Sequence, residues 1–263
     1  MKRNVIAVLC FLVSLAAASC SKVDALFNNG EPVAETREVE NHFSAILMYN
    51  NVNVKLVHDS HPHLELTCPK NLIDKVTTEV QGDTLIIRNE NDFNWLRSYD
   101  YSIDLTVYYD SLREVNFASV GDLRCTDSIR GYGTLSIDTT EGNVNTHWVR
   151  SFNLNINEGC GEIDLTLNCS VVKNNFINGT SRTTLRGRAE YTEIIMRSYG
   201  LVHAENLYSN FVRVQSHSTN DAYVWARTKL TVWLYSIGNV YYKGSPQVVK
   251  QCTSDGQVFK LQP

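Results

Sequence analysis

A short phrase recurs along the C-terminal half of the chain with a nearly constant step. Each copy has an alternating apolar segment, a small polar turn that usually holds a glycine, and a second alternating segment. The equivalent turn positions are Gly121, Gly142, Gly161, Ser181, Gly200, Asn220, Gly238 and Gly256. The steps between them are 21, 19, 20, 19, 20, 18 and 18 residues. A regular step of this size predicts stacked coils.

Apolar and polar residues alternate after each turn. The residues two positions beyond it are Leu123, Val144, Ile163, Thr183, Val202, Ala222, Val240 and Val258. Two further on stand Cys125, Thr146, Leu165, Leu185, Ala204, Val224, Tyr242 and Lys260. Side chains two apart share one face of a strand, so we expect two inward ladders and almost no helix. The sequence predicts an all-β fold, a right-handed parallel β-helix (β-solenoid) with about 18–21 residues per coil.

The turn glycines have an expected physical role. Each coil must turn a corner where backbones stack about 4.8 Å apart, and a positive φ there is tolerated best by glycine. Asn220 can adopt the same left-handed conformation, whereas Ser181 is less suited to it.

Residues 35–115 are rich in strand-forming residues but lack the repeated phrase. The segment 52–57 leads into the turn His58–His63 and returns through 64–68, which predicts a hairpin. We expect one solenoid domain over 37–263, in which 37–115 form the N-terminal coils and cap and 116–263 the regular repeats.

The first residues have the pattern of a secretory signal peptide, residues 1–19. Lys2 and Arg3 precede a short apolar run that ends in Ala17-Ala18-Ser19-Cys20. The segment Ala17-Ala18-Ser19-Cys20 resembles a lipoprotein lipobox, which implies a lipid on Cys20. This lipid would attach the chain to the outer membrane, on either the periplasmic or the cell-surface side. Residues 20–36 would then be a lipidated tether. The alternative is an ordinary signal peptide cut near Ala18, which would release a soluble protein.

Charge and cysteine content exclude several functions. The net charge is −4, or −6 once Lys2 and Arg3 are removed, and no basic cluster remains, which argues against nucleic acid as a partner. Without a C-x-x-C pair, a zinc ribbon or a thioredoxin-like motif is unsupported. We predict no cofactor and no metal, and leave open whether any disulfide forms among Cys68, Cys125, Cys160, Cys169 and Cys252.

The repeats resemble a known family. The segments 238–246 and 82–87, with the small-Gly-polar-apolar turns between them, are similar to the auto-transporter adhesin head domain, formerly a domain of unknown function, of Bacteroides-like lipoproteins. The resemblance covers about Phe43 to Leu261 and departs from the pattern at Ser181 and Asn220. It implies a right-handed β-helix related in shape to pectin lyases, without their catalytic residues, and a role in adhesion.

Three groups of residues are candidates for function. The histidines His58, His61 and His63 crowd one turn, which is more typical of a polar loop than of a metal site. Acidic and basic side chains gather on the middle coils, as a polysaccharide lyase or hydrolase would need; they are Asp138, Glu141, Glu158, Glu162, Asp164, Arg182, Arg186 and Arg188. Aromatic rings cluster in the last coils, and exposed rings bind sugars and proteins; our candidate ligand-binding residues are Trp225, Trp233, Tyr235 and Tyr241.

The leading hypothesis is a cell-envelope lipoprotein with a non-catalytic, adhesin-like head that binds a polysaccharide or protein partner. By alternation, Trp233 and Tyr241 should point outward if Val232 and Val240 point inward. The alternatives are a carbohydrate-active β-helix enzyme and a structural envelope protein that assembles with itself as a homo-oligomer.

Overall fold

The computed structural model describes residues 28–92, 101–140 and 143–262, with the side chains of 134–148 left aside. The predicted signal peptide and Cys20 lie outside this part of the chain. Within it, no helix has the length and apolarity needed to span a membrane.

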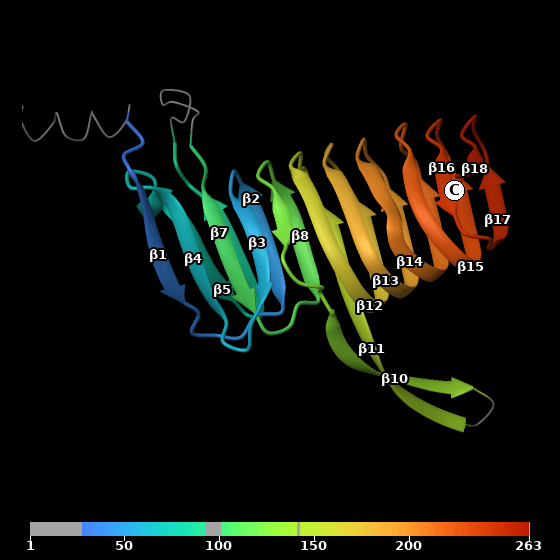
Figure 1. Ribbon diagram of the computed structural model, residues 1–263, viewed down its shortest axis with the longest axis horizontal. Helices are drawn as coiled ribbons and strands as arrows, with labels where there is room; N and C mark the ends of the chain where they lie inside the picture. The colour runs from blue at the N-terminus through green and yellow to red at the C-terminus, as the bar shows by residue number, and fades with distance from the viewer. Residues whose placement is uncertain (1–27, 93–100, 141–142, 263) are drawn as a thin grey trace, which may run out of the picture.

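The protein is an all-β structure, as the alternation predicted. Its helical content is one short 3-10 turn, η1 (Ile73–Lys75), among the described residues. Figure 1 shows the strands side by side along the long axis, from β1 at one end to β17 and β18 at the other. The strands are β1 (Pro32–Glu38), β2 (Ala45–Asn50), β3 (Asn53–His58), β4 (His63–Pro69), β5 (Val76–Gln81), β6 (Thr84–Asn89), β7 (Asp104–Tyr109), β8 (Glu114–Ser119), β9 (Leu123–Cys125), β10 (Tyr132–Thr140), β11 (Asn143–Ile156), β12 (Glu162–Phe176), β13 (Arg182–Met196), β14 (Leu201–Ser216), β15 (Ala222–Leu234), β16 (Val240–Lys243), β17 (Gln247–Cys252) and β18 (Val258–Lys260).

The long strands β12 to β15 pair in parallel with the predicted step. Ile163 pairs with Thr183, Thr183 with Val202, Val202 with Ala222 and Ala222 with Val240. We call one long strand with the turn that follows it a rung. Within each rung the alternation of buried and exposed side chains is interrupted once. There, two consecutive side chains, such as Ser170 and Val171, both lie outside the core. The strand bends at this corner, so each rung contributes a first half and a second half.

The two halves continue into separate faces. Face one consists of β1, β4, β7, β3, β9, the first halves of β12 to β15, β16 and β18. Face two consists of β5, β6, β2, β8, the end of β11, the second halves of β12 to β15, and β17. Both faces contribute side chains to one hydrophobic core.

The first predicted ladder is buried in the middle rungs. Ile163, Thr183, Val202, Ala222 and Val240 are at most 1% exposed. The alternating apolar side chains of the second halves enter the same core. Because burying one Leu, Ile or Val side chain contributes about 1.5–3 kcal/mol, these ladders are the main source of stability.

The sheet is mixed. The pairs β1/β4, β4/β7, β5/β6 and β10/β11 are antiparallel, whereas β12 to β15 pair in parallel. A right-handed parallel β-helix therefore stays a prediction.

One predicted coil is replaced by a hairpin. Strands β10 and β11 pair antiparallel, Val144 opposite Thr139, and the hairpin projects away from the row of strands (Figure 1). Leu123 pairs directly with Ile163, so the ladder skips Val144. The prediction that Val144 belongs to the ladder was wrong, because a hairpin turn and a coil turn use similar residues. Glu141 and Gly142 lie outside the described residues.

The N-terminal part departs from the predicted hairpin at residues 52–68. Strand β7 lies between β3 and β4, pairing in parallel with β3 and antiparallel with β4. The sheet also begins before the predicted tether boundary at residue 36, because β1 pairs with β4 from Pro32 onward. Strands β2 and β3 pair with β8 and β9, so the N-terminal strands continue both faces of the stack.

The turn glycines are required for a reason other than the predicted one. Gly121, Gly161 and Gly238 do not have a positive φ, and neither does Asn220. A Cβ atom on Gly161 would instead collide with the carbonyl oxygen of Gly121 on the neighbouring rung. The close approach of stacked backbones excludes a side chain at these positions.

Candidate ligand-binding surface

The structure divides the four predicted aromatic residues between two faces. Trp225 pairs with Tyr208 and Lys243 on face one, which also carries Tyr241. Trp233 pairs with Gln215 on face two, and Tyr235 follows on the same side. Val232 and Val240 are buried while Trp233 and Tyr241 are partly exposed, so the alternation argument holds. The four residues do not form one site.

Face one carries a continuous column of stacked rings. His203 stacks on Tyr223 with ring centroids 4.8 Å apart, and Tyr223 on Tyr241 at 5.0 Å. Tyr241 stacks on Phe259 at 5.4 Å. Each ring follows an inward ladder position on its own rung, so the strand pairing sets the spacing. We call His203, Tyr223, Tyr241 and Phe259 the ring column.

The stacking determines what the ring column can offer to a ligand. The faces of the inner rings cover one another, so the ring edges are directed away from the core. The Tyr223 and Tyr241 hydroxyls have no hydrogen-bond partner in the described part of the chain. Burial raises the pKa of Tyr223, which keeps its hydroxyl protonated at neutral pH. The column thus presents two hydroxyl groups, those of Tyr223 and Tyr241, about one strand spacing apart.

Trp225 lies beside this column in a different arrangement. Its ring meets Tyr208 edge-on at 5.1 Å, and the Lys243 ammonium lies 5.9 Å from its centroid. Tyr208 in turn lies under the Arg188 guanidinium, 5.5 Å away. These contacts combine apolar area with positive charge at the edge of face one.

On face two the candidate rings are partly covered. The Arg213 guanidinium lies 4.4 Å from the Trp233 centroid and also pairs with Glu193 at 3.4 Å. Tyr235 stacks on His217 at 4.4 Å and is 43% exposed. Because Arg213 covers one side of Trp233, this indole is less available to a sugar ring than the sequence suggested.

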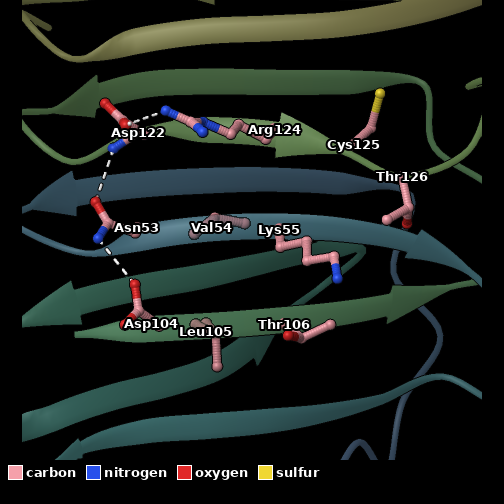
Figure 2. Close-up of a pocket in the computed structure, with 10 residues that line it drawn as sticks. All are labelled: Asn53, Val54, Lys55, Asp104, Leu105, Thr106, Asp122, Arg124, Cys125 and Thr126. Atoms are coloured by element: carbon pink, nitrogen blue, oxygen red, sulfur yellow. Dashed lines mark hydrogen bonds and ion pairs between the residues drawn. The ribbon is translucent and has the colours of Figure 1, made fainter. Parts of the chain in front are cut away.

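A shallow groove of about 560 Å³ lies over β3, β7 and β9 on face one (Figure 2). Asn53 donates to Asp104 at 2.9 Å and accepts from the Asp122 amide at 3.0 Å. Asp122 accepts from Arg124 and from the Glu162 amide, both at 3.0 Å. The second Asp104 oxygen accepts from Ser102.

This hydrogen-bond chain limits the chemistry of the groove. All four carboxylate oxygens of Asp104 and Asp122 accept hydrogen bonds, and one oxygen of each carboxylate links neighbouring strands. A glycosidase needs one carboxyl group that gives a proton to the substrate and another that faces it. The groove is therefore better suited to binding than to acid–base catalysis.

The acids and bases predicted on the middle coils do not converge on a groove. Asp164 and Arg186 form an exposed ion pair across β12 and β13, and Glu162 lies opposite Arg182 in the same register. Glu158 lies in a turn with a positive φ of 66°. Asp138 and Glu141 fall outside the described side chains.

The histidine turn has a structural explanation. His63 stacks on Tyr108 at 4.0 Å, and His58 meets Tyr109 edge-on at 5.8 Å. Asp59 accepts from the His61 amide, and this hydrogen bond lowers the pKa of its carboxyl group. No cluster of three metal-ligating side chains occurs in the described ranges.

The five cysteines in the described ranges are free thiols. Burial raises the pKa of Cys68 to about 11 and that of Cys169 to about 12.

Sequence reasoning missed three members of the ring column, His203, Tyr223 and Phe259. A signal was present, because with Tyr241 they recur at steps of 20, 18 and 18 residues, directly after Val202, Ala222, Val240 and Val258. Selecting aromatic residues by type emphasised the tryptophans instead.

Comparison with known proteins identifies related folds. The family model described as "Putative auto-transporter adhesin, head GIN domain" matches residues 42–246. A solved structure from Bacteroides fragilis, described as a putative adhesin, is 16% identical with a TM-score of 0.75; the alignment covers 89% of this chain and 100% of that one. None of the curated proteins matches in sequence.

Two further solved structures are similar. A putative adhesin from Parabacteroides merdae is 18% identical with a TM-score of 0.61, over 89% of this chain and 98% of that one. A structure from Parabacteroides distasonis, described as a putative lipid binding protein, is 16% identical with a TM-score of 0.61, over 90% of this chain and 99% of that one. At these identities the likeness shows the fold.

Proposed function

Because this chain belongs to the family described as "Putative auto-transporter adhesin, head GIN domain", we propose that it is the non-catalytic, adhesin-like head of a cell-envelope lipoprotein. In this proposal it binds a polysaccharide or protein partner along the outer side of its stacked strands. The ring column carries the proposal, because aromatic rings on the four strands β14, β15, β16 and β18 stack in three successive contacts at a nearly constant spacing. A repeated contact of this kind suits an extended or multivalent ligand.

The proposal includes the anchor and the winding of the chain. A lipid on Cys20 would attach the protein to the outer membrane, and the chain before Pro32 would connect the lipid to the sheet. The rungs would wind right-handed, as parallel crossovers do in most proteins. The hydrogen-bonded carboxylates of the Figure 2 groove support a binding role over a hydrolase or lyase.

The proposal is tested by screening the purified protein against glycans and matrix proteins, with product analysis of every glycan that binds. The double variant Tyr223→Phe/Tyr241→Phe keeps the stacked rings and removes both hydroxyls. Since one hydrogen bond contributes about 0.5–1.5 kcal/mol, we expect affinity to fall about tenfold while thermal unfolding is unchanged.

Tyr235→Phe is the matched control, because this exposed hydroxyl lies on face two. Equal losses in the control and in the double variant would contradict a site at the ring column. Cleavage of any bound glycan would contradict the non-catalytic role and favour the carbohydrate-active alternative.

A further inference from the structure

A second groove lies at the corner where the middle rungs bend from face one to face two. It measures about 730 Å³, and its lining includes Arg150, Arg188 and Arg227. These side chains come from β11, β13 and β15, so the strand pairing brings together residues 38 and 39 positions apart in the sequence. The groove is separate from the Figure 2 groove.

The charges in this corner groove are unbalanced. All three arginines are exposed, and none forms an ion pair with a carboxylate whose side chain is described. Glu190 is the acidic residue in the lining, and its Oε2 accepts a hydrogen bond from Asn210 at 2.6 Å. A positively charged groove thus occurs on a protein whose net charge is −4.

The arrangement of the arginines favours a polymer over a single ion. They lie on every second strand, and neighbouring strands are about 4.8 Å apart, so cationic groups recur roughly every 10 Å along the stack. A guanidinium group binds a carboxylate or sulfate with two parallel hydrogen bonds. Tyr208 and Asn210 add hydrogen-bonding groups for uncharged hydroxyls.

We propose that the corner groove binds an acidic polysaccharide, with Arg150, Arg188 and Arg227 contacting its carboxylate or sulfate groups. This inference rests on the proposed function and gives it a ligand class. Nucleic acid fits less well, because its affinity depends on neutralising many phosphates with Lys and Arg, and the negative net charge of this protein opposes so dense a polyanion.

The test measures binding of the whole chain to four immobilised polymers, polygalacturonate, heparin, dextran and duplex DNA, at low and moderate salt. The variant Arg150→Gln/Arg188→Gln/Arg227→Gln removes the three charges of the groove. The control Arg182→Gln/Arg197→Gln/Lys250→Gln removes three exposed charges elsewhere. The single variant Arg227→Gln guards against misfolding, since this exposed side chain has no hydrogen bond or ion pair within the described residues.

We expect an acidic polysaccharide to bind and dextran not to bind. The groove variant should weaken this binding at least about tenfold and make it less dependent on salt. The single variant Arg227→Gln should weaken the binding two- to fivefold. The control variant should change it less than twofold. Equal losses in the groove and control variants, binding to DNA as tight as to the glycans, or no binding to either acidic glycan would overturn the inference. If a different ligand then binds in a way that depends on Tyr223 and Tyr241, the proposed function stands and only the inference about the corner groove fails. If no ligand binds, the proposed function and the inference both fail.

Discussion

Gly161 shows how strongly the stack constrains single positions. A Cβ atom there would meet the carbonyl oxygen and carbon of Gly121 on the next rung, and these backbone atoms cannot rotate aside. The sequence identified the position correctly but suggested the wrong cause, because a regular spacing of glycines does not distinguish backbone torsion from close approach.

Replacing Gly161 with alanine should therefore destabilise the protein. We expect a loss of about 1–3 kcal/mol, the usual cost of overpacking, which lowers Tm by several degrees in a domain of this size. Asn220→Ala is the control at an equivalent turn, where a side chain is already accommodated and only its hydrogen bond to the Tyr199 carbonyl is lost. Differential scanning calorimetry measures both, and equal Tm changes would contradict the role assigned to Gly161.

The cysteines should differ in reactivity according to burial. The thiolate is the reactive form, and the raised pKa values of Cys68 and Cys169, about 11 and about 12, keep both thiols protonated between pH 7 and pH 9. Over this pH range we expect maleimide to label the exposed Cys160 and Cys252 in the native protein, while the buried Cys68 and Cys169 stay unlabelled. Peptide mapping by mass spectrometry measures the labelling of each cysteine, with guanidinium-unfolded protein as the positive control. Labelling of Cys68 or Cys169 in the native protein would contradict the prediction.

At the scale of elements, local patterns predicted which segments are strands but not always how they pair. Alternation located β12 to β15, and their step gave the correct register. The prediction of the register failed at β10 and β11, because Gly142 has the same spacing in the sequence as the turn positions of the repeats. It also gave no sign that Val54 pairs with Leu123, 69 positions away, because pairing over such distances depends on the assembled core.

The β10–β11 hairpin should be dispensable for the stack. Leu123 pairs with Ile163, and Val115 with Leu154, without any residue of the hairpin tip. Replacing residues 135–148 with Asn-Gly, a favoured two-residue turn, should leave the Tm within a few degrees of the parent. Circular dichroism melts check this. Loss of cooperative unfolding would show instead that the hairpin is part of the folding unit.

At the scale of the whole molecule, the family and the all-β class were predictable, whereas the sites were not. The selected aromatics proved to lie on two faces, since a strand that bends at a corner turns residues eight positions apart, such as Trp225 and Trp233, to different sides. The corner groove has no sequence signature of its own. Its arginines occupy different register columns, and they come together only through the pairing of strands β11 to β15 at the bend of the rungs.

Strands β17 and β18 each pair on one side only within the described part of the chain. Every rung contacts its immediate neighbours, and the same contacts recur from β12 to β15. A duplication of one rung in the gene would therefore be accommodated by the surfaces that already exist. The length of the stack is a quantity that evolution can change in whole increments of about 4.8 Å, without redesigning either end.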